Sequence, residues 1–313
     1  MKIILNQPFS FHQNGLRGNQ EDSRWPDLDT VDASQRFFIV CDGVGGEDCG
    51  EVASQTVCQA FAEALDATDW NQPFADADFQ QALNHAYDAL DNKKDANPEM
   101  ATTLTLAAFH EAGCTVAHIG DSRIYQVRPG AGILYRSNDH SLVNALVHSG
   151  NLSPDKAEDH PQGNVITRYM GPATPESPRL SATVVRLTDI QPGDYFVLCS
   201  DGVLHQVDDE QLEDILGSDT ADEEKCRQLA TLSHDSSDNN TLWLIPVKEV
   251  ENDEEQDAGE EPGEDEAPGD GRATTNLRKQ NTDDTAHDVE ASEPAVRQSM
   301  GSKVANFFKR LFS

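Results

Sequence analysis

Carboxylate side chains recur in this sequence where apolar runs end. Asp42 directly follows the apolar run 37–41, and three glycines stand within the next four positions. Asp201 closes the run 195–199 in the same way and is followed by a glycine, while Asp121 closes a third run. Glycine lets the backbone turn sharply and approach a ligand closely. Because hard divalent cations prefer carboxylate and carbonyl oxygens, this pattern indicates a cation site.

Further polar side chains extend the candidate site. Glu21 and Asp22 lie in a polar loop, and Asp238 precedes the last apolar run, with no His or Cys at ligand spacing. An all-oxygen set favours Mg²⁺ or Mn²⁺ over zinc. Two such ions bridged by a carboxylate acidify a shared water and stabilise an in-line displacement. Arg17 would grip a phosphate with two hydrogen bonds, so the chemistry indicated is metal-assisted phosphoester hydrolysis.

A second acidic pattern suggests a different phosphatase chemistry. The run Asp27-Leu28-Asp29-Thr30-Val31 matches the D-x-D-x-[TV] motif of haloacid-dehalogenase-type phosphatases. The nucleophilic Asp of that motif follows a buried strand, whereas Ser23-Arg24-Trp25-Pro26 precedes it here. Because proline opposes a central strand, we reject this interpretation.

Composition limits the class of protein. The 313 residues carry a formal net charge of −33, and residues 1–248 alone hold 39 acidic and 16 basic side chains. Such a surface repels nucleic acid, so we expect no nucleic-acid partner. No signal peptide and no apolar run of ~18–20 residues is found, so we expect a cytoplasmic protein. The six scattered cysteines lack a C-x-x-C pair and are expected to be reduced.

The elements that must position the acids can be predicted from periodicity. Apolar residues at 3–4 spacing predict helices, and consecutive apolar runs joined by short turns predict antiparallel strands. Residues 138–175 are polar, begin with a short helix and read as a flap over the sheets; a solvated role is favoured for its His140, His148 and His160. The helices are expected at 50–67, 79–92, 208–216 and 221–232, and the strands at 102–109, 114–119, 124–127, 133–135, 182–187, 195–199 and 241–245.

The C-terminal part differs in composition. Residues 249–270 carry twelve acidic side chains and no basic ones, and 249–300 as a whole predict an acidic disordered linker. Residues 301–313 place apolar side chains at helical spacing with Lys303, Lys309 and Arg310 facing away, which predicts a short basic amphipathic helix. Docking on an anionic membrane or a partner groove stays open beside packing back on the folded part or fraying.

With these motifs in view, the sequence resembles the metal-dependent protein serine/threonine phosphatases of type 2C in their bacterial form. Eight motifs stand in the family's order over roughly residues 8–247, and a full set in sequence is far more specific than any one of them. They are Arg17 to Ser23, Val40 to Gly46, Ala101-Thr102-Thr103, Gly120-Asp121-Ser122-Arg123, Asp139-His140-Ser141, Val165-Ile166-Thr167-Arg168, Ser200-Asp201-Gly202 and Ser237 to Thr241.

The resemblance implies an α+β fold in which two antiparallel β-sheets flanked by helices form a four-layer αββα sandwich. The phosphatase domain would span residues 1–248. It also implies the metal ligands. Asp42 would bridge two Mn²⁺ or Mg²⁺ ions, one of which the Gly43 carbonyl also binds. Asp201 and Asp238 would bind the first ion.

The remaining roles follow from the same resemblance. Glu21 would hold the second ion largely through water, Asp22 would orient that water, and Arg17 would hold the substrate phosphate. Asp121 would form, with Asp201, a weaker third metal site.

The implied activity is hydrolysis of phosphoserine and phosphothreonine in proteins, in opposition to a cognate serine/threonine kinase. We expect a monomer in the cytoplasm, with a peripheral position at the inner membrane face if the C-terminal helix docks there. Animal relatives carry, at the position of Val44, the His that is their proposed general acid, so another group must supply that proton. A catalytically silent phosphoprotein binder is the alternative, but it would have lost acidic positions that are all filled here.

Overall fold

The computed structural model describes residues 1–44, 49–153, 156, 160–163, 165–175 and 177–251. These residues fall within one compact unit, Met1–Asp253. None of the described helices is long and apolar enough to cross a membrane. The predicted linker from residue 252 onward and the predicted helix 301–313 lie outside the described residues.

Two antiparallel sheets form the centre of the described part. One has five strands in the order β11-β8-β7-β4-β3. Its members are β3 (Ser23–Trp25), β4 (Phe37–Cys41), β7 (Leu104–His110), β8 (Gly113–Ile119) and β11 (Thr183–Leu187).

The other sheet has six strands in the order β1-β13-β12-β9-β10, and β2 pairs with β13 beside β1. The last strand in sequence, β13, therefore lies inside the sheet, between β12 and the two N-terminal strands. The members are β1 (Lys2–Leu5), β2 (Phe9–Gln13), β9 (Arg123–Arg128), β10 (Gly132–Arg136), β12 (Tyr195–Cys199) and β13 (Asn240–Glu251), while β5 (Gly43–Val44) and β6 (Ala101–Thr102) form a separate short pair.

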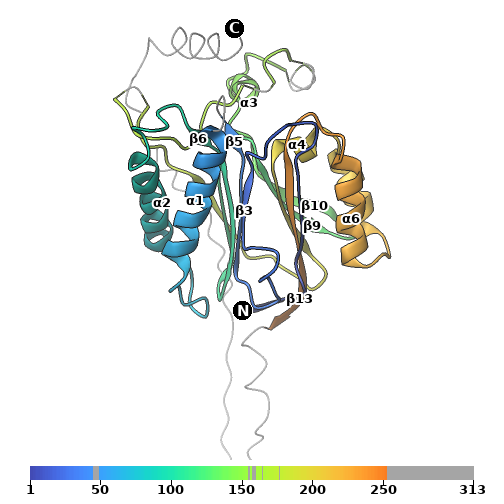
Figure 1. The fold of residues 1–313 in the computed structure, drawn as a ribbon. Helices are drawn as coiled ribbons and strands as arrows, with labels where there is room; N and C mark the ends of the chain where they lie inside the picture. The colour runs from blue at the N-terminus through green and yellow to red at the C-terminus, as the bar shows by residue number, and fades with distance from the viewer. Residues whose placement is uncertain (45–48, 154–155, 157–159, 164, 176, 252–313) are drawn as a thin grey trace, which may run out of the picture. The chain divides into compact units, whose positions relative to one another are not determined.

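Helices cover the outer face of each sheet (Figure 1). The pair α1 (Cys49–Leu65) and α2 (Asp76–Asp91) packs on the five-stranded sheet, and α5 (Asp209–Gly217) and α6 (Asp222–Ser233) pack on the six-stranded one. The short helix α4 is Asp201–Leu204, and α3 (Leu142–His148) lies in the flap. The predicted four-layer αββα sandwich is thus confirmed.

Strand β4 shows why its sequence is apolar without alternation. Phe38 and Val40 point into the core between the sheets, where the Phe38 ring lies 5.3 Å from the Trp243 ring. Phe37 and Ile39 point instead into the core beneath α1 and α2. Because both faces of the strand are covered, every position must be apolar.

The structure differs from the sequence prediction mainly at the ends of the domain. The strands β1, β2 and β3 and the single-turn α4 were not predicted, and Thr103 separates β6 from β7 within the predicted strand 102–109. The strand β13 extends to Glu251, past the domain end predicted at 248. Pairing with β1, in which Lys2 lies opposite Glu251, keeps these polar residues in the sheet and outweighs their linker-like composition.

Candidate active site

The backbone of Asp42 is fixed by two threonines at the end of β4. The amide of Asp42 donates to Thr103 Oγ1 over 2.9 Å, and the amide of Thr103 donates to the Asp42 carbonyl over 2.8 Å. The Thr102 hydroxyl donates to the same carbonyl over 2.8 Å. Because both oxygen and nitrogen of its peptide groups are engaged, Asp42 has little freedom to move away from the strand end.

Asp201 and Asp238 are brought together by a close approach of two backbones. A Cβ atom at Gly202 would lie 1.9 Å from the carbonyl oxygen of Asn239, so only glycine allows this contact. The Ser236 hydroxyl donates to the Gly202 carbonyl over 2.7 Å and strengthens it. Asp201 begins α4, and Asp238 lies two residues before β13.

Asn239 joins the loop that carries Glu21 and Asp22 to the loop that carries Asp238. Its Oδ1 accepts from the Glu21 amide over 2.8 Å. Its Nδ2 donates to the carbonyls of Asn14 and Asn19 over 3.0 and 2.9 Å. Asn239 belongs to the motif Ser237 to Thr241, but its supporting role could not be predicted from the sequence. Its three hydrogen-bond partners lie some 220 positions away in the chain.

Asp22 is buried and only half satisfied. The Ser200 hydroxyl donates to Asp22 Oδ2 over 2.7 Å, and that hydroxyl accepts in turn from the Thr241 amide over 2.9 Å. Asp22 Oδ1 is buried with no hydrogen-bond partner among the described residues. Burial, together with repulsion by Asp201 and Asp238, raises the pKa of Asp22 to about 7.

Asp121 follows β8 and lies close to the Asp42 loop. Thr103, which holds Asp42, is also hydrogen-bonded to Ser122 over 2.7 Å between the two hydroxyl oxygens. The neighbouring Arg123 donates through Nε and Nη2 to both carboxylate oxygens of Asp139, over 2.8 and 2.7 Å, and so does not pair with Asp121. Burial, and then repulsion by Asp201 and Asp139, raise the pKa of Asp121 to about 8.

The site aspartates are close enough to raise one another's pKa. Burial raises the pKa of Asp42 well above its usual value, and repulsion from the four other site aspartates raises it further; these are Asp22, Asp201, Asp121 and Asp238. Burial also raises the pKa of Asp201, although His205 and a side-chain hydrogen bond with Asp42 oppose the shift. Asp22 is buried and the other four aspartates are half-buried. Carboxylates that repel one another in such a site are costly to ionise unless a cation lies among them.

Gly43 and Glu21 lie against the start of α1. The Gly43 amide donates to the Glu21 carbonyl over 3.2 Å, and a Cβ at Gly43 would lie 2.3 Å from the Gly50 carbonyl oxygen. Asn19 Nδ2 donates to Glu21 Oε1 over 3.2 Å. The absence of a side chain at Gly43 therefore lets the loop, the helix and Glu21 meet beside Asp42.

Arg17 reaches the acidic site from a half-exposed position. Its Nη2 donates to Asp238 Oδ2 over 2.8 Å and its Nε to the Ser237 carbonyl over 3.2 Å. Half of the side chain, 52%, remains exposed, so the guanidinium can still be reached by a ligand.

The donor chemistry of these residues fits hard divalent cations. The site offers carboxylates that repel one another and a buried Asp22 oxygen that lacks a partner. Among the described residues no three His, Cys, Asp or Glu side chains already form a set that could hold an ion.

The flap histidines lie outside this acidic set. His140 is half-buried and hydrogen-bonded, and burial, His118 and Arg168 together lower the pKa of His140 to about 3. His148 contacts only its own helix, at the Asn144 carbonyl, and His160 accepts from the Gln162 amide. The sequence expectation of a solvated side chain is therefore wrong for His140.

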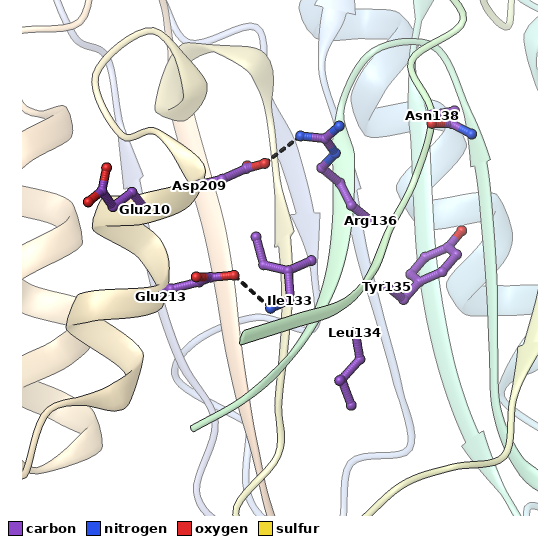
Figure 2. A pocket seen from close by; sticks show the side chains of 8 residues that line it. All are labelled: Ile133, Leu134, Tyr135, Arg136, Asn138, Asp209, Glu210 and Glu213. Atoms are coloured by element: carbon purple, nitrogen blue, oxygen red, sulfur yellow. Dashed lines mark hydrogen bonds and ion pairs between the residues drawn. The ribbon is translucent and has the colours of Figure 1, made fainter. Parts of the chain in front are cut away.

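A separate hollow lies between the edge strand β10 and α5 (Figure 2). It has a volume of about 530 Å³ and contains none of the predicted site residues. Two of its three acids have partners, since Asp209 pairs with Arg136 and Glu213 accepts the Ile133 amide over 2.7 Å. The lining residues are Ile133, Leu134, Tyr135, Arg136, Asn138, Asp209, Glu210 and Glu213.

Known proteins share both the sequence motifs and the fold. Residues 27–239 match the family described as protein phosphatase 2C. The protein phosphatase PhpP of Streptococcus pneumoniae is 29% identical over 228 residues, which cover 69% of this chain and 88% of PhpP. The crystal structure of the Mycobacterium tuberculosis serine/threonine phosphatase PstP/Ppp aligns with a TM-score of 0.68 and 28% identity, over 78% of this chain and 100% of that one.

A structure of the PstP catalytic domain in complex with two manganese ions aligns with a TM-score of 0.64 and 28% identity, over 79% of this chain and 100% of that one. The family match spans about two thirds of the chain and includes Asp42, Asp121, Asp201 and Asp238, but it begins after Arg17, Glu21 and Asp22. The chain therefore belongs to the protein phosphatase 2C family of metal-dependent serine/threonine phosphatases, in its bacterial form.

Proposed function

We propose that the chain hydrolyses phosphoserine and phosphothreonine in proteins with a water activated at a binuclear Mn²⁺ or Mg²⁺ centre. Its family membership makes it a protein serine/threonine phosphatase of type 2C. The finer mechanism is supported by the cluster of Asp22, Asp42, Asp121, Asp201 and Asp238, whose mutual repulsion calls for positive charge. That cluster is the observation on which the proposal rests.

In this proposal Asp42 would be shared by the two ions, and the Gly43 carbonyl would help to hold one of them. Asp201 and Asp238 would hold the first ion, and Glu21 would hold the second largely through water. When bound, the ions lower the pKa of a shared water and stabilise the charge of the reacting phosphoryl group. A third, weaker ion would lie with Asp121 and Asp201, in line with their mutual repulsion.

The remaining side chains bind and orient. Asp22 Oδ2 is held by Ser200, which leaves Oδ1 to accept a hydrogen bond from the attacking water. Arg17 can give the substrate phosphate the hydrogen bonds that it now gives to Asp238 and to the Ser237 carbonyl. Val44 in β5 has no proton to donate, so the leaving alkoxide takes its proton from water or another group.

The test is hydrolysis of para-nitrophenyl phosphate and of a phosphothreonine peptide by the full chain. We expect activity only with added Mn²⁺ or Mg²⁺, complete loss with chelator, and a fall of at least about 10³-fold in Asp42→Asn, since the bridging charge is removed. Activity that survives chelation would contradict the metal mechanism. A folded protein that binds phosphopeptide with no turnover at any metal concentration would favour the silent phosphoprotein binder.

We further propose that the phosphatase opposes a serine/threonine kinase and acts as a monomer in the cytoplasm. The basic pattern of residues 301–313 supports a peripheral contact with the inner membrane face or with a partner. Deleting residues 301–313 and following the protein by cell fractionation tests this contact. We expect a shift from the membrane fraction to the soluble fraction; an unchanged distribution would contradict the membrane contact.

A further inference from the structure

His140 stands where the chain leaves the sheets for the flap, residues 138–175, and it is bonded to the loop of Asp121. The His140 amide donates to the Gly120 carbonyl over 2.9 Å, and the Gly120 amide donates back to His140 Nδ1 over 3.1 Å. Gly120 has a φ of +110°, and a Cβ there would lie 2.6 Å from the Thr103 side chain. The residue before Asp121 is therefore confined by Thr103 on one side and by His140 on another.

The same histidine also bonds the returning half of the flap. The His140 carbonyl accepts from the Thr167 amide over 2.7 Å and from the Thr167 hydroxyl over 2.8 Å. Because Nδ1 accepts from an amide, Nε2 carries the proton and donates to Thr183 Oγ1 over 2.9 Å. His140 thus connects four segments: the end of β8, both halves of the flap and strand β11.

A second histidine, His118, packs against the ring of His140. The His118 ring stacks on the His140 ring, with centroids 4.5 Å apart and planes 12° apart. His118 Nε2 donates to the Asn138 carbonyl over 2.8 Å, which fixes the first residue of the flap. Since His118 is buried in β8, the stacked pair ties the flap to the interior of the sheet.

The far end of the flap is attached to the loop of Asp42. Met170 and Thr102 exchange both backbone hydrogen bonds, each 2.8 Å long, and Met170 is fully buried. Thr102 in turn donates through its hydroxyl to the Asp42 carbonyl. Each end of the flap is therefore linked to a site aspartate, directly to the Asp121 loop through His140 and indirectly to Asp42 through Met170 and Thr102.

We propose that His140 is a positioning residue that fixes the base of the flap relative to the Asp121 loop, so that a phosphoprotein is presented correctly to the acidic site. This inference rests on the proposed function of that site. A protein substrate extends beyond its phosphate and meets the flap, whereas para-nitrophenyl phosphate is too small to do so. Losing the His140 contacts should consequently affect the two substrates unequally.

The first test is hydrogen exchange in the full chain with chelator present, which does not depend on activity. In His140→Ala the Gly120 amide loses its side-chain acceptor, so we expect it to exchange about fivefold faster or more, as one lost hydrogen bond implies. The Thr167 amide keeps its acceptor, the backbone carbonyl of residue 140, and we expect it to exchange faster because the base of the flap is no longer held in place. His140→Asn can still offer Oδ1 to the Gly120 amide and should restore its protection. His234→Ala, an exposed histidine that contacts only Asp235, is the matched control and should leave both amides unchanged.

The second test compares kinetics on two substrates. For His140→Ala we expect kcat/KM on a phosphothreonine protein to fall roughly tenfold or more, mainly through KM, and kcat on para-nitrophenyl phosphate to change less than about threefold. Thr183→Val removes only the Nε2 partner and should give a smaller loss in the same direction. His140→Asn should recover most of the activity on the protein substrate.

The outcomes separate this inference from the proposed function. Equal loss on both substrates, together with a lower Tm and no rescue by His140→Asn, would make His140 a purely structural residue and overturn the proposal. Unchanged exchange at Gly120 and Thr167 would overturn it as well. If the wild-type chain has no activity on either substrate, the proposed function fails, but the exchange experiment still decides whether His140 holds the flap.

Discussion

Individual residues in this site act through the few partners that hold them. Asp22 has one oxygen fixed by Ser200 and the other unsatisfied, and Asp42 has its peptide groups bonded to Thr102 and Thr103. An aspartate with a free lone pair and a fixed backbone is preorganised to bind a cation or a water molecule, because this binding then costs little side-chain or backbone entropy. The hydroxyls of Ser200, Thr102 and Thr103 therefore hold Asp22 and Asp42 in place.

The phosphate-binding role proposed for Arg17 can be tested by substitution. In Arg17→Ala we expect KM for a phosphoprotein to rise and kcat/KM to fall roughly tenfold to a hundredfold, because a charge-assisted grip on phosphate is lost. Arg17→Lys should recover part of the loss, since a lysine keeps the charge without the fork. Steady-state kinetics measure this, and Arg227→Ala on α6 serves as the control. A normal KM in Arg17→Ala would show that another group binds the phosphate.

At the scale of elements, the site depends on loops that approach one another too closely for side chains. The end of β12 and the start of β13 meet at Gly202 and Asn239, which sets Asp201 beside Asp238. The Asn239 amide then extends the contact to the N-terminal loop. The strands set the direction in which each acid leaves the sheet, but these loop contacts determine how far apart the acids lie.

The glycine at this contact can be tested directly. Gly202→Ala places a Cβ 1.9 Å from the Asn239 carbonyl oxygen, so we expect a loss of about 3 kcal/mol in the free energy of unfolding. A protein of this size should then melt roughly 10 °C lower and lose most of its phosphatase activity. Gly217→Ala in α5, where no atom lies within 4 Å of the added Cβ, is the matched control. Equal Tm values for the two variants would contradict the tight contact.

The elements were predictable from sequence to the extent that their burial is local. The apolar run 195–199 gives β12 with its observed bounds, and the acids at strand ends were recognised as one candidate site. The strand β2 was missed because its polar residues Ser10, His12 and Gln13 hide a pairing with β13 from the far end of the chain. Ser200 and Asn239 were missed as supports for the same reason, since their partners lie far away in sequence. The catalytic roles of the acids stay predictions.

At the scale of the whole molecule, the repulsion among the site carboxylates lowers the stability of the folded state. The aspartates come from both sheets, and the packed core between the sheets holds them together. Burial and mutual repulsion raise the pKa of Asp22 to about 7 and that of Asp121 to about 8. Without bound cations, the folded state therefore disfavours the ionised form of these carboxyl groups.

This cost predicts the pH dependence of stability. Because the folded pKa values lie above those of the unfolded chain, the unfolded state releases its protons first as pH rises. With chelator present, the contribution of these two carboxyl groups to the free energy of unfolding is greatest below about pH 4. It then decreases by a few kcal/mol as pH rises from about 4 to about 7–8. Thermal unfolding at pH 5.5 and 8 measures the difference, and added Mn²⁺ should abolish it by binding the folded state.

Two variants sharpen that experiment. Asp22→Asn removes one buried titrating group, so the metal-free protein should be more stable than wild type at pH 8 while losing activity. Asp66→Asn, an exposed acid after α1, is the control and should melt like wild type at both pH values. A metal-free wild type that is more stable at pH 8 than at pH 5.5 would contradict the proposed clustering of carboxylates.

The position of β13 has a consequence for protein synthesis. This strand, the last of the described ones, completes the middle of a sheet whose strands β1 and β2 come from residues 2–13, and Asp238 lies two residues before it. A chain that stops before residue 238 lacks both this central strand and one acid of the candidate site. We therefore expect a ribosome-stalled or prematurely terminated product to lack phosphatase activity, which should appear only after residue 251 has left the exit tunnel and the sheet has closed.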